Sequence, residues 1–191
     1  MTVYELILKR RTIRRFKPEQ VPEELLNKLV NAGRVAPSGA NLQPLEFIVV
    51  NNSELVAKVF PSLKWAGYIA PAGNPPEGKR PMAYIIVLIN TEIRSNGGEV
   101  DAAAAIENMI LTALEDGVGS CWLGAIDRDQ LRALLNISQK YQIDSVLALG
   151  YPDESPVLEE MTDSIKYWKD ENGVLHVPKR KFSDIVHYNI F

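Results

Sequence analysis

The longest helical pattern in the sequence covers residues 101–115 and leaves almost no polar face. Its apolar positions are Ala102 to Ala105, Ile106, Met109, Ile110, Ala113 and Leu114. A helix that is apolar nearly all round lies at the centre of a domain or at a subunit interface. The rest of the chain must therefore cover this helix. Asp101, at its start, is interpreted as the helix cap in preference to a catalytic carboxylate.

Short apolar runs that are typical of buried strands alternate with helical patterns along the chain. Strands are expected at 46–50, 83–89, 120–124 and 145–149, and helices at 2–8, 22–36, 54–60 and 127–135. This alternation predicts a mixed α/β class, with a sheet of about four or five strands. At 191 residues the chain is expected to form one domain, residues 1–191.

Two segments do not show such patterns. Residues 61–81 contain many prolines and glycines, so we expect a long irregular loop that is functional or mobile. The loop carries two large aromatic residues, Trp65 and Tyr68. After Pro152 the chain is mostly polar and is expected to be extended. Such a tail is hard to fold alone, and we expect it to wrap a partner subunit.

The composition excludes several classes of protein. The chain is 46% hydrophobic with a formal net charge of -3, has no apolar run near 18 residues, and begins without a signal-peptide pattern. We therefore expect a soluble cytoplasmic protein without a membrane partner. The two histidines, His176 and His187, fit no metal-ligand pattern, so no metal is expected. Cys121 is interpreted as a structural thiol rather than a nucleophile.

A basic stretch follows the first expected helix, and six of the nine residues from Lys9 to Lys17 are cationic. Such crowding is unfavourable unless an anion lies among the charges. Arg10, Thr12 and Arg14 alternate, so an extended segment would point them to one side, where they suit a phosphate. The alternatives are a solvated turn or a nucleic-acid-binding arm, and the overall charge argues against the second.

A second polar cluster lies on a glycine-containing loop just before the first expected strand. It consists of Ser38, Asn41 and Gln43. Amide side chains offer both donors and acceptors, so they suit the edge of a flat heterocycle. The alternative is ordinary turn chemistry, because serine, glycine and asparagine are common turn residues.

Together these features resemble the nitroreductase family of FMN-dependent NAD(P)H oxidoreductases. Residues 10–14, Arg-Arg-Thr-Ile-Arg, look like its Arg-Arg-Ser-x-Arg motif, with Thr12 in place of serine. Residues 36–44 match its Pro-Ser-x-x-Asn-x-Gln-Pro loop. Residues 101–124 resemble its long interface helix and the glycine-ended segment that follows, and residues 150–152 and 180–181 resemble later landmarks.

The resemblance implies a central, mostly antiparallel sheet of four to five strands surrounded by helices. It also implies an intertwined homodimer with a C-terminal extension onto the partner and two FMN sites at the interface. The expected reaction passes a hydride from NADH or NADPH through flavin N5 to a small acceptor such as a nitroaromatic or quinone. No side chain is then expected to be catalytic. Alternatives are reductive dehalogenation, oxidation of a ring substrate, or a flavin-binding sensor with little turnover.

The resemblance also assigns residues to the FMN site. The phosphate, ribityl chain and ring edge would be held by Arg10, Arg11, Thr12 and Arg14. Arg180 would reach the same phosphate, with Lys179 and Lys181 as alternatives. The other subunit would supply Pro37, Ser38, Gly39, Asn41 and Gln43. Trp122, Leu123 and Gly124 would lie along the isoalloxazine, with a backbone N–H near N5.

Two features depart from the family pattern. Residue 45 is leucine where many members carry tryptophan, and the loop of residues 61–81 is not a universal family feature. This loop is expected to shape the substrate side through Trp65 and Tyr68. The physiological acceptor therefore stays open.

Overall fold

The computed structural model describes all 191 residues of the chain. Its helices are α1 (Val3–Lys9), α2 (Glu23–Arg34), α3 (Ser53–Val59), α4 (Gly98–Glu115) and α5 (Arg128–Leu135). Its strands are β1 (Leu45–Val50), β2 (Ala83–Asn90), β3 (Gly119–Leu123), β4 (Tyr141–Gly150), β5 (Val157–Glu160), β6 (Trp168–Lys169) and β7 (Leu175–Lys179). None of the helices combines the length and apolarity that a membrane crossing requires.

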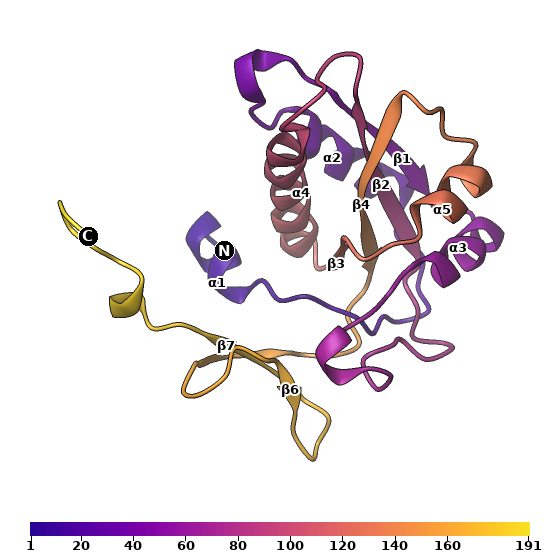
Figure 1. The fold of residues 1–191 in the computed structure, drawn as a ribbon. Coiled ribbons are helices and arrows are strands. Elements are labelled where there is room, and N and C mark those ends of the chain that lie inside the picture. Colours follow the sequence, from indigo (N-terminus) through magenta and orange to yellow (C-terminus); the bar gives the residue numbers. More distant parts are fainter.

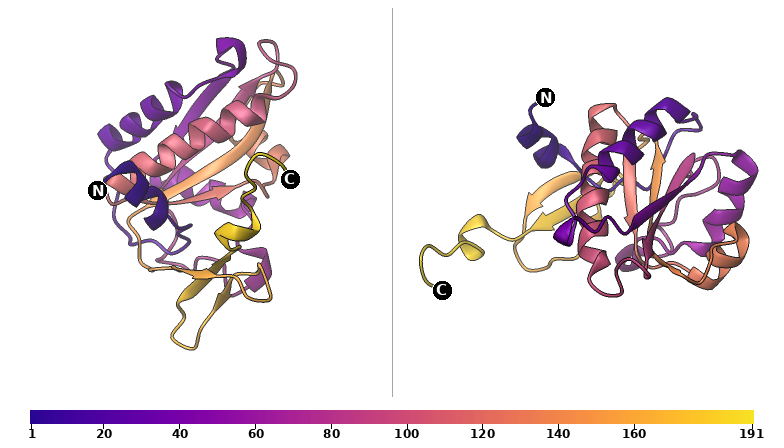
Figure 2. Two further views of the ribbon diagram at one scale, coloured as in Figure 1. Left: turned by 90° about the vertical axis from the view of Figure 1, so that its left-hand side faces the viewer. Right: turned by 90° about the horizontal axis from the view of Figure 1, so that it is seen from above.

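The main sheet has four strands in the order β1-β2-β4-β3, and every neighbouring pair is antiparallel. β2 lies inside the sheet and all eight of its residues are buried, which explains its unbroken apolar sequence. Helices α2 and α4 cover one face, and α3 and α5 cover the other (Figures 1 and 2). The predicted α/β class with a mostly antiparallel sheet is therefore confirmed.

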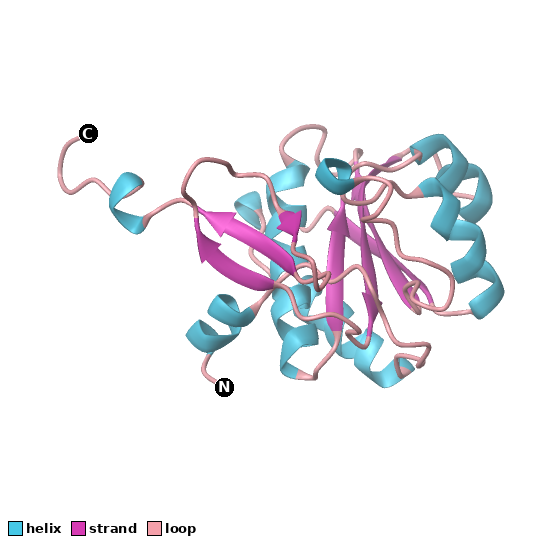
Figure 3. Cartoon of the chain, turned by 90° about the horizontal axis from the view of Figure 1, so that it is seen from below, coloured by secondary structure: helices cyan, strands magenta, loops and turns pink.

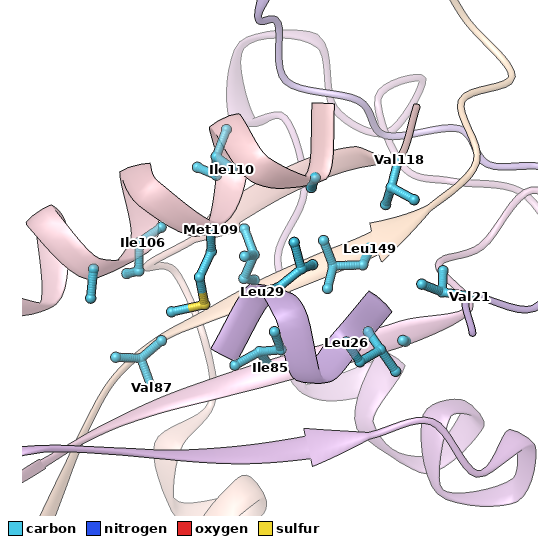
Figure 4. Close-up of a cluster of buried hydrophobic side chains, with 14 of the residues drawn as sticks. Val21, Leu26, Leu29, Ile85, Val87, Ile106, Met109, Ile110, Val118 and Leu149 are labelled. Carbon is cyan, nitrogen blue, oxygen red and sulfur yellow. The ribbon is translucent and has the colours of Figure 1, made fainter. Parts of the chain in front are cut away.

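The core beneath α4 explains the apolar residues on one side of that helix. Met109 and Ile106 of α4 lie in one buried cluster with Leu29 of α2 and with Ile85 and Leu149 of the sheet (Figure 4). All five side chains are fully buried. Helix α4 thus packs against both α2 and the sheet, whereas Ala103, Ala104 and Leu111 on its remaining side are only half-buried.

The prediction that Asp101 caps this helix is wrong. Helix α4 begins at Gly98, after Gly97, whose φ of 79° places it in the left-handed region that glycine favours. Asp101 therefore lies one turn inside the helix, where it is 4% exposed. Its carboxylate is directed at other segments of the chain and has a different role, described below.

The polar tail forms a small sheet that its sequence pattern did not indicate. Strands β5, β7 and β6 pair in that order beside the main sheet, and the C-terminus extends beyond them (Figure 3). Trp168 and His176 stack with ring centroids 4.2 Å apart. The Trp168 Nε1–H donates to Glu159 Oε1 at 2.8 Å, and His176 Nδ1 lies 2.9 Å from Glu159 Oε2. The strands pair through their backbones, and the side chains between them form a polar network without apolar alternation, so the sequence shows no strand periodicity here.

Candidate functional site

The basic stretch runs along the edge of β3. Thr12 forms a parallel bridge with Ser120, and the Ile13 N–H donates to the Ser120 carbonyl at 2.9 Å. Gly119 makes this approach feasible, because a Cβ there would lie 2.8 Å from Ile13 Cγ1. The structure thus brings the predicted phosphate-binding residues beside the strand that leads into Trp122, Leu123 and Gly124.

Replacing Gly119 with alanine is expected to push the basic stretch away from β3. Overpacking of this kind lowers the free energy of unfolding by about 1–3 kcal/mol. Chemical denaturation would measure the loss. Gly67→Ala is the matched control, because a Cβ at Gly67 meets nothing within 4 Å. Equal stabilities for the two variants would contradict the close approach at Gly119.

A cavity of about 220 Å³ lies between the basic stretch and the end of α4. Arg10 and Arg11 line it together with apolar side chains, including those of Ile110, Leu114 and Val118. Burial and the neighbouring charge of Arg10 both lower the pKa of Arg11. The Arg11 Nε is buried without a hydrogen-bond partner, and the only ion pair of Arg10 is with Glu107 at 3.8 Å. These unsatisfied cationic donors fit an anion.

Arg14 lies on the other side of the stretch. It lines a much smaller cavity with Arg15, Glu154 and Lys169, and its guanidinium carbon lies 5.2 Å from the centre of the Tyr167 ring. The Arg14 Nε is also buried without a partner. The alternation had predicted Arg10 and Arg14 on one side. It fails because Arg10 is still the C-cap of α1, so the extended segment begins only after it.

The loop of residues 37–44 is held in a strained conformation. Ala40, Asn41 and Gln43 all have positive φ values of 51° to 55°. The Ser38 hydroxyl accepts the Gln43 N–H at 3.0 Å, so part of the polar cluster does serve as turn chemistry. Strain of this kind is retained where the surrounding structure enforces it.

The buried carboxylate of Asp101 enforces the loop conformation. Its Oδ1 accepts the Gly39 N–H at 3.0 Å, and its Oδ2 pairs with Arg94 Nη1 at 2.8 Å. A Cβ at Gly39 would lie 2.3 Å from Arg94 Nη1, so a larger residue there would displace the Arg94 guanidinium from its present position. The first turn of α4 therefore anchors the loop that was predicted to flank the flavin.

The two predicted walls lie at opposite ends of α4 within one chain. Gly39 is bonded to Asp101 in the first turn of α4, whereas Leu114 in its last turn lines the arginine cavity. Asp101 and Leu114 are thirteen positions apart, which corresponds to about 20 Å along the helix axis. Figure 1 shows α1 near one end of α4 and the loop before β1 near the other. One chain alone does not bring both walls to one small molecule.

The other predicted site residues are placed as follows. Arg180 is exposed after β7, donates to the Asp184 carbonyl at 2.8 Å, and does not line the arginine cavity of its own chain. Lys181 pairs with Glu160 at 3.5 Å. Trp122 is 42% exposed, whereas Leu123 is buried. Pro37, Ser38 and Gln43 line a shallow cavity at the start of β1.

The two aromatic residues of the 61–81 loop have different surroundings. Trp65 is 5% exposed and stacks on Phe60 at 5.8 Å, inside the second core cluster, because the loop folds it against α3 and the sheet. We therefore withdraw Trp65 as a substrate-contacting residue. Tyr68 is 56% exposed and lies against Tyr167, with ring centroids 5.0 Å apart. The role of Tyr68 on the substrate side stays a prediction.

Cys121 lies beneath the basic stretch and is fully buried, which agrees with a structural thiol. Burial raises its pKa to about 12, although the charge of Arg14 partly offsets the effect. At pH 8 only about one thiol in ten thousand is then ionised, and the thiolate is the reactive form. We expect iodoacetamide to leave Cys121 unlabelled in the folded chain at pH 8 and to label it in urea, as mass spectrometry would show.

Three residues of this region were not singled out from the sequence. Glu154 and Tyr167 each contact Arg14, and Arg94 pairs with the Asp101 carboxylate that binds Gly39; each comes from a distant or loop segment. Glu154 follows the recognised Gly-Tyr-Pro segment by only two residues. This closeness to a recognised motif could have pointed to Glu154, whereas the sequence holds no comparable indication for the other two residues.

Comparison with known proteins gives a consistent result. The model of the nitroreductase family matches residues 7–151. A protein of Archaeoglobus fulgidus named after NADH dehydrogenase and NAD(P)H nitroreductase activities is 32% identical over 166 residues, covering 83% of this chain and 90% of its own. An iodotyrosine deiodinase of Thermotoga neapolitana is 27% identical, covering 80% of this chain and 89% of its own.

Solved structures extend the likeness to the C-terminal residues. The structure of an FMN-dependent nitroreductase from Clostridium difficile superimposes with a TM-score of 0.72 at 26% identity. The match covers 97% of this chain and 98% of that one. The similarity therefore includes the small second sheet as well as the main sheet.

Proposed function

Because the chain belongs to the nitroreductase family, we propose that it is an FMN-dependent enzyme that passes a hydride from NADH or NADPH to a small acceptor. A nitroaromatic or a quinone is the expected acceptor class. The observation that carries the proposal is the set of buried cationic donors without partners, the Nε atoms of Arg11 and Arg14. Such donors are unfavourable unless an anion or an acceptor meets them.

The residues present fit FMN. Arg10 and Arg11 line the 220 Å³ cavity, whose apolar wall comes from α4, and would hold the phosphate and ribityl chain there. Thr12 does not line this cavity, and its role in the cofactor site rests on the family motif alone. Arg14 would face the ring edge, where a positive charge favours the reduced, anionic form. Trp122 and Gly124 would flank the ring from the end of β3. When bound, FMN supplies the centre that accepts and donates the hydride.

We further propose a homodimer in which each FMN site is shared. The separation of the two walls along α4 supports this, because a second copy can bring its 37–44 loop to the arginines of the first. Exposed apolar side chains support it as well. They lie on α1 and in the C-terminal tail: Val3, Tyr4, Ile7, Leu8, Phe182, Ile185, Tyr188, Ile190 and Phe191. The tail, with Arg180, would then reach the partner.

The absorbance spectrum of the purified protein tests the cofactor. We expect flavin bands at about one FMN per chain, and rapid bleaching of these bands by NADH or NADPH without oxygen. A colourless protein that cannot be reconstituted with FMN would refute the proposal. Slow reduction by every donor would favour a flavin-binding sensor instead.

Reductive dehalogenation is a second candidate reaction on the same site. The 27% identity to an iodotyrosine deiodinase supports its inclusion. A panel of nitroaromatics, quinones and halogenated phenols would separate the reactions by kcat/KM, and loss of halide from the phenols would identify dehalogenation. Two earlier expectations, a cytoplasmic location and a single domain over residues 1–191, stay predictions.

A further inference from the structure

Glu154 is the one acidic residue that lines both cavities around the basic stretch. It lies just after β4 and faces Arg10 and Arg11 in the larger cavity, and Arg14, Arg15 and Lys169 in the smaller one. An acidic residue so placed would be expected to form an ion pair with one of these cations. It forms none within 4.0 Å.

Glu154 instead binds the main chain of the basic stretch. Its Oε1 accepts the Arg14 N–H at 2.5 Å and the Arg15 N–H at 3.2 Å. Hydrogen bonds from N–H groups to a carboxylate are stronger than neutral ones. The Asp153 N–H adds a bond to the Arg15 carbonyl at 2.9 Å. The turn after β4 therefore holds the backbone of two consecutive arginines.

The N–H groups on either side of Arg14 and Arg15 have other partners. Ile13 donates to Ser120 of β3 at 2.9 Å, Phe16 to the Lys79 carbonyl at 3.0 Å, and Lys17 to the Tyr151 carbonyl at 2.8 Å. Arg14 and Arg15 lie between these anchors and have no backbone acceptor. Without Glu154, two partly buried N–H groups would lose their partners, which is unfavourable.

We propose that Glu154 is a positioning residue for the cofactor site: it fixes the backbone of Arg14 so that the guanidinium stays free for the flavin. The inference rests on the proposed FMN function and adds a residue to it. It explains why the Arg14 Nε is buried without a partner although a carboxylate lies beside it. The carboxylate is occupied by main-chain donors, and the side chain of Arg14 is left for the ligand.

The role predicts a specific pattern of FMN affinities, measured by fluorescence titration of the apoprotein. Glu154→Ala should weaken FMN binding about tenfold. The Arg14 backbone is then no longer fixed, and the guanidinium loses the equivalent of one charge-assisted hydrogen bond to FMN. Glu154→Gln keeps an oxygen acceptor at the same position and should restore the affinity to within about threefold. Asp153→Asn is the control. It removes a neighbouring carboxylate whose ion-pair partner is Lys79, and should leave the affinity unchanged.

A double-mutant cycle with Arg14→Ala tests whether Glu154 acts through Arg14. In the Arg14→Ala background, Glu154→Ala should change the FMN affinity by less than about twofold. An undiminished tenfold loss there, or a Gln variant as weak as the Ala variant, would overturn the inference. If Glu154→Ala does not fold, Glu154→Asp takes its place, since it withdraws the oxygen by one methylene.

The cycle also separates this inference from the proposed function. Wild-type protein that takes up no FMN would overturn the proposed function and this inference with it. Wild-type protein that binds FMN, with no coupling between Glu154 and Arg14, would overturn this inference alone.

Discussion

Replacing Arg14 with alanine is expected to weaken FMN binding by roughly 10- to 150-fold, the equivalent of about 1.5–3 kcal/mol for a hydrogen bond to a charged group. The physical reason is the buried Arg14 Nε, which has no partner in the chain itself. Titration of the apoprotein with FMN, followed by the quenching of flavin fluorescence, would measure the effect.

Two further variants make the Arg14 result specific. Arg14→Lys keeps the charge but loses the planar fork, so its affinity should lie between wild type and alanine. Lys17→Ala removes one charge from the same stretch at an exposed position and should leave the affinity near the wild-type value. A Lys17 variant as weak as Arg14→Ala would show that general charge, and not a contact of Arg14, controls binding.

Replacing Asp101 with alanine is expected to lower the free energy of unfolding by about 3–5 kcal/mol, because it leaves the charge of Arg94 without its partner. Arg94 is 22% exposed, so it can turn partly to water, and the lower end of this range is the more fitting expectation. The Gly39 N–H would lose its acceptor in the same change. Denaturation in urea would measure the loss.

Asp101→Asn separates the contribution of the Arg94 ion pair from that of the hydrogen bond that anchors the loop at Gly39. The amide oxygen still accepts the Gly39 N–H, whereas the ion pair with Arg94 is lost. Glu107→Ala is the control on the same helix, since its contact with Arg10 is long, at 3.8 Å, and half exposed. A loss at Glu107 as large as the loss at Asp101 would contradict the anchoring role of the buried carboxylate.

Local patterns in the sequence predicted most of the fold. The helices expected at 2–8 and 127–135 are found as α1 and α5, which a Thr2–Glu5 capping box and an Asp127 cap begin. The expected apolar runs form strands β1, β2 and β4. Such strands can be predicted because the side chains that they bury follow one another in a short, continuous segment of the sequence. The small second sheet was missed because its strands are short and its side-chain contacts, among Trp168, His176 and Glu159, produce no apolar periodicity.

The candidate site was predicted as a set of segments but not as an arrangement. The structure separates Arg10 from Arg14, and it buries Trp65 in the core. Each error has the same origin. The direction of a side chain depends on where a helix ends or on which distant surface a loop packs, and a single segment does not contain that information.

By itself, the sequence determined the α/β class, the central buried helix and the two stretches, residues 10–14 and 37–44, to which the proposed FMN site is assigned. Only the tertiary structure decided what holds them in place. Asp101 anchors Gly39 across 62 residues, and Glu154 anchors Arg14 across 140. A hydrogen bond depends on distance in space, so partners this far apart along the chain leave no local pattern to predict them.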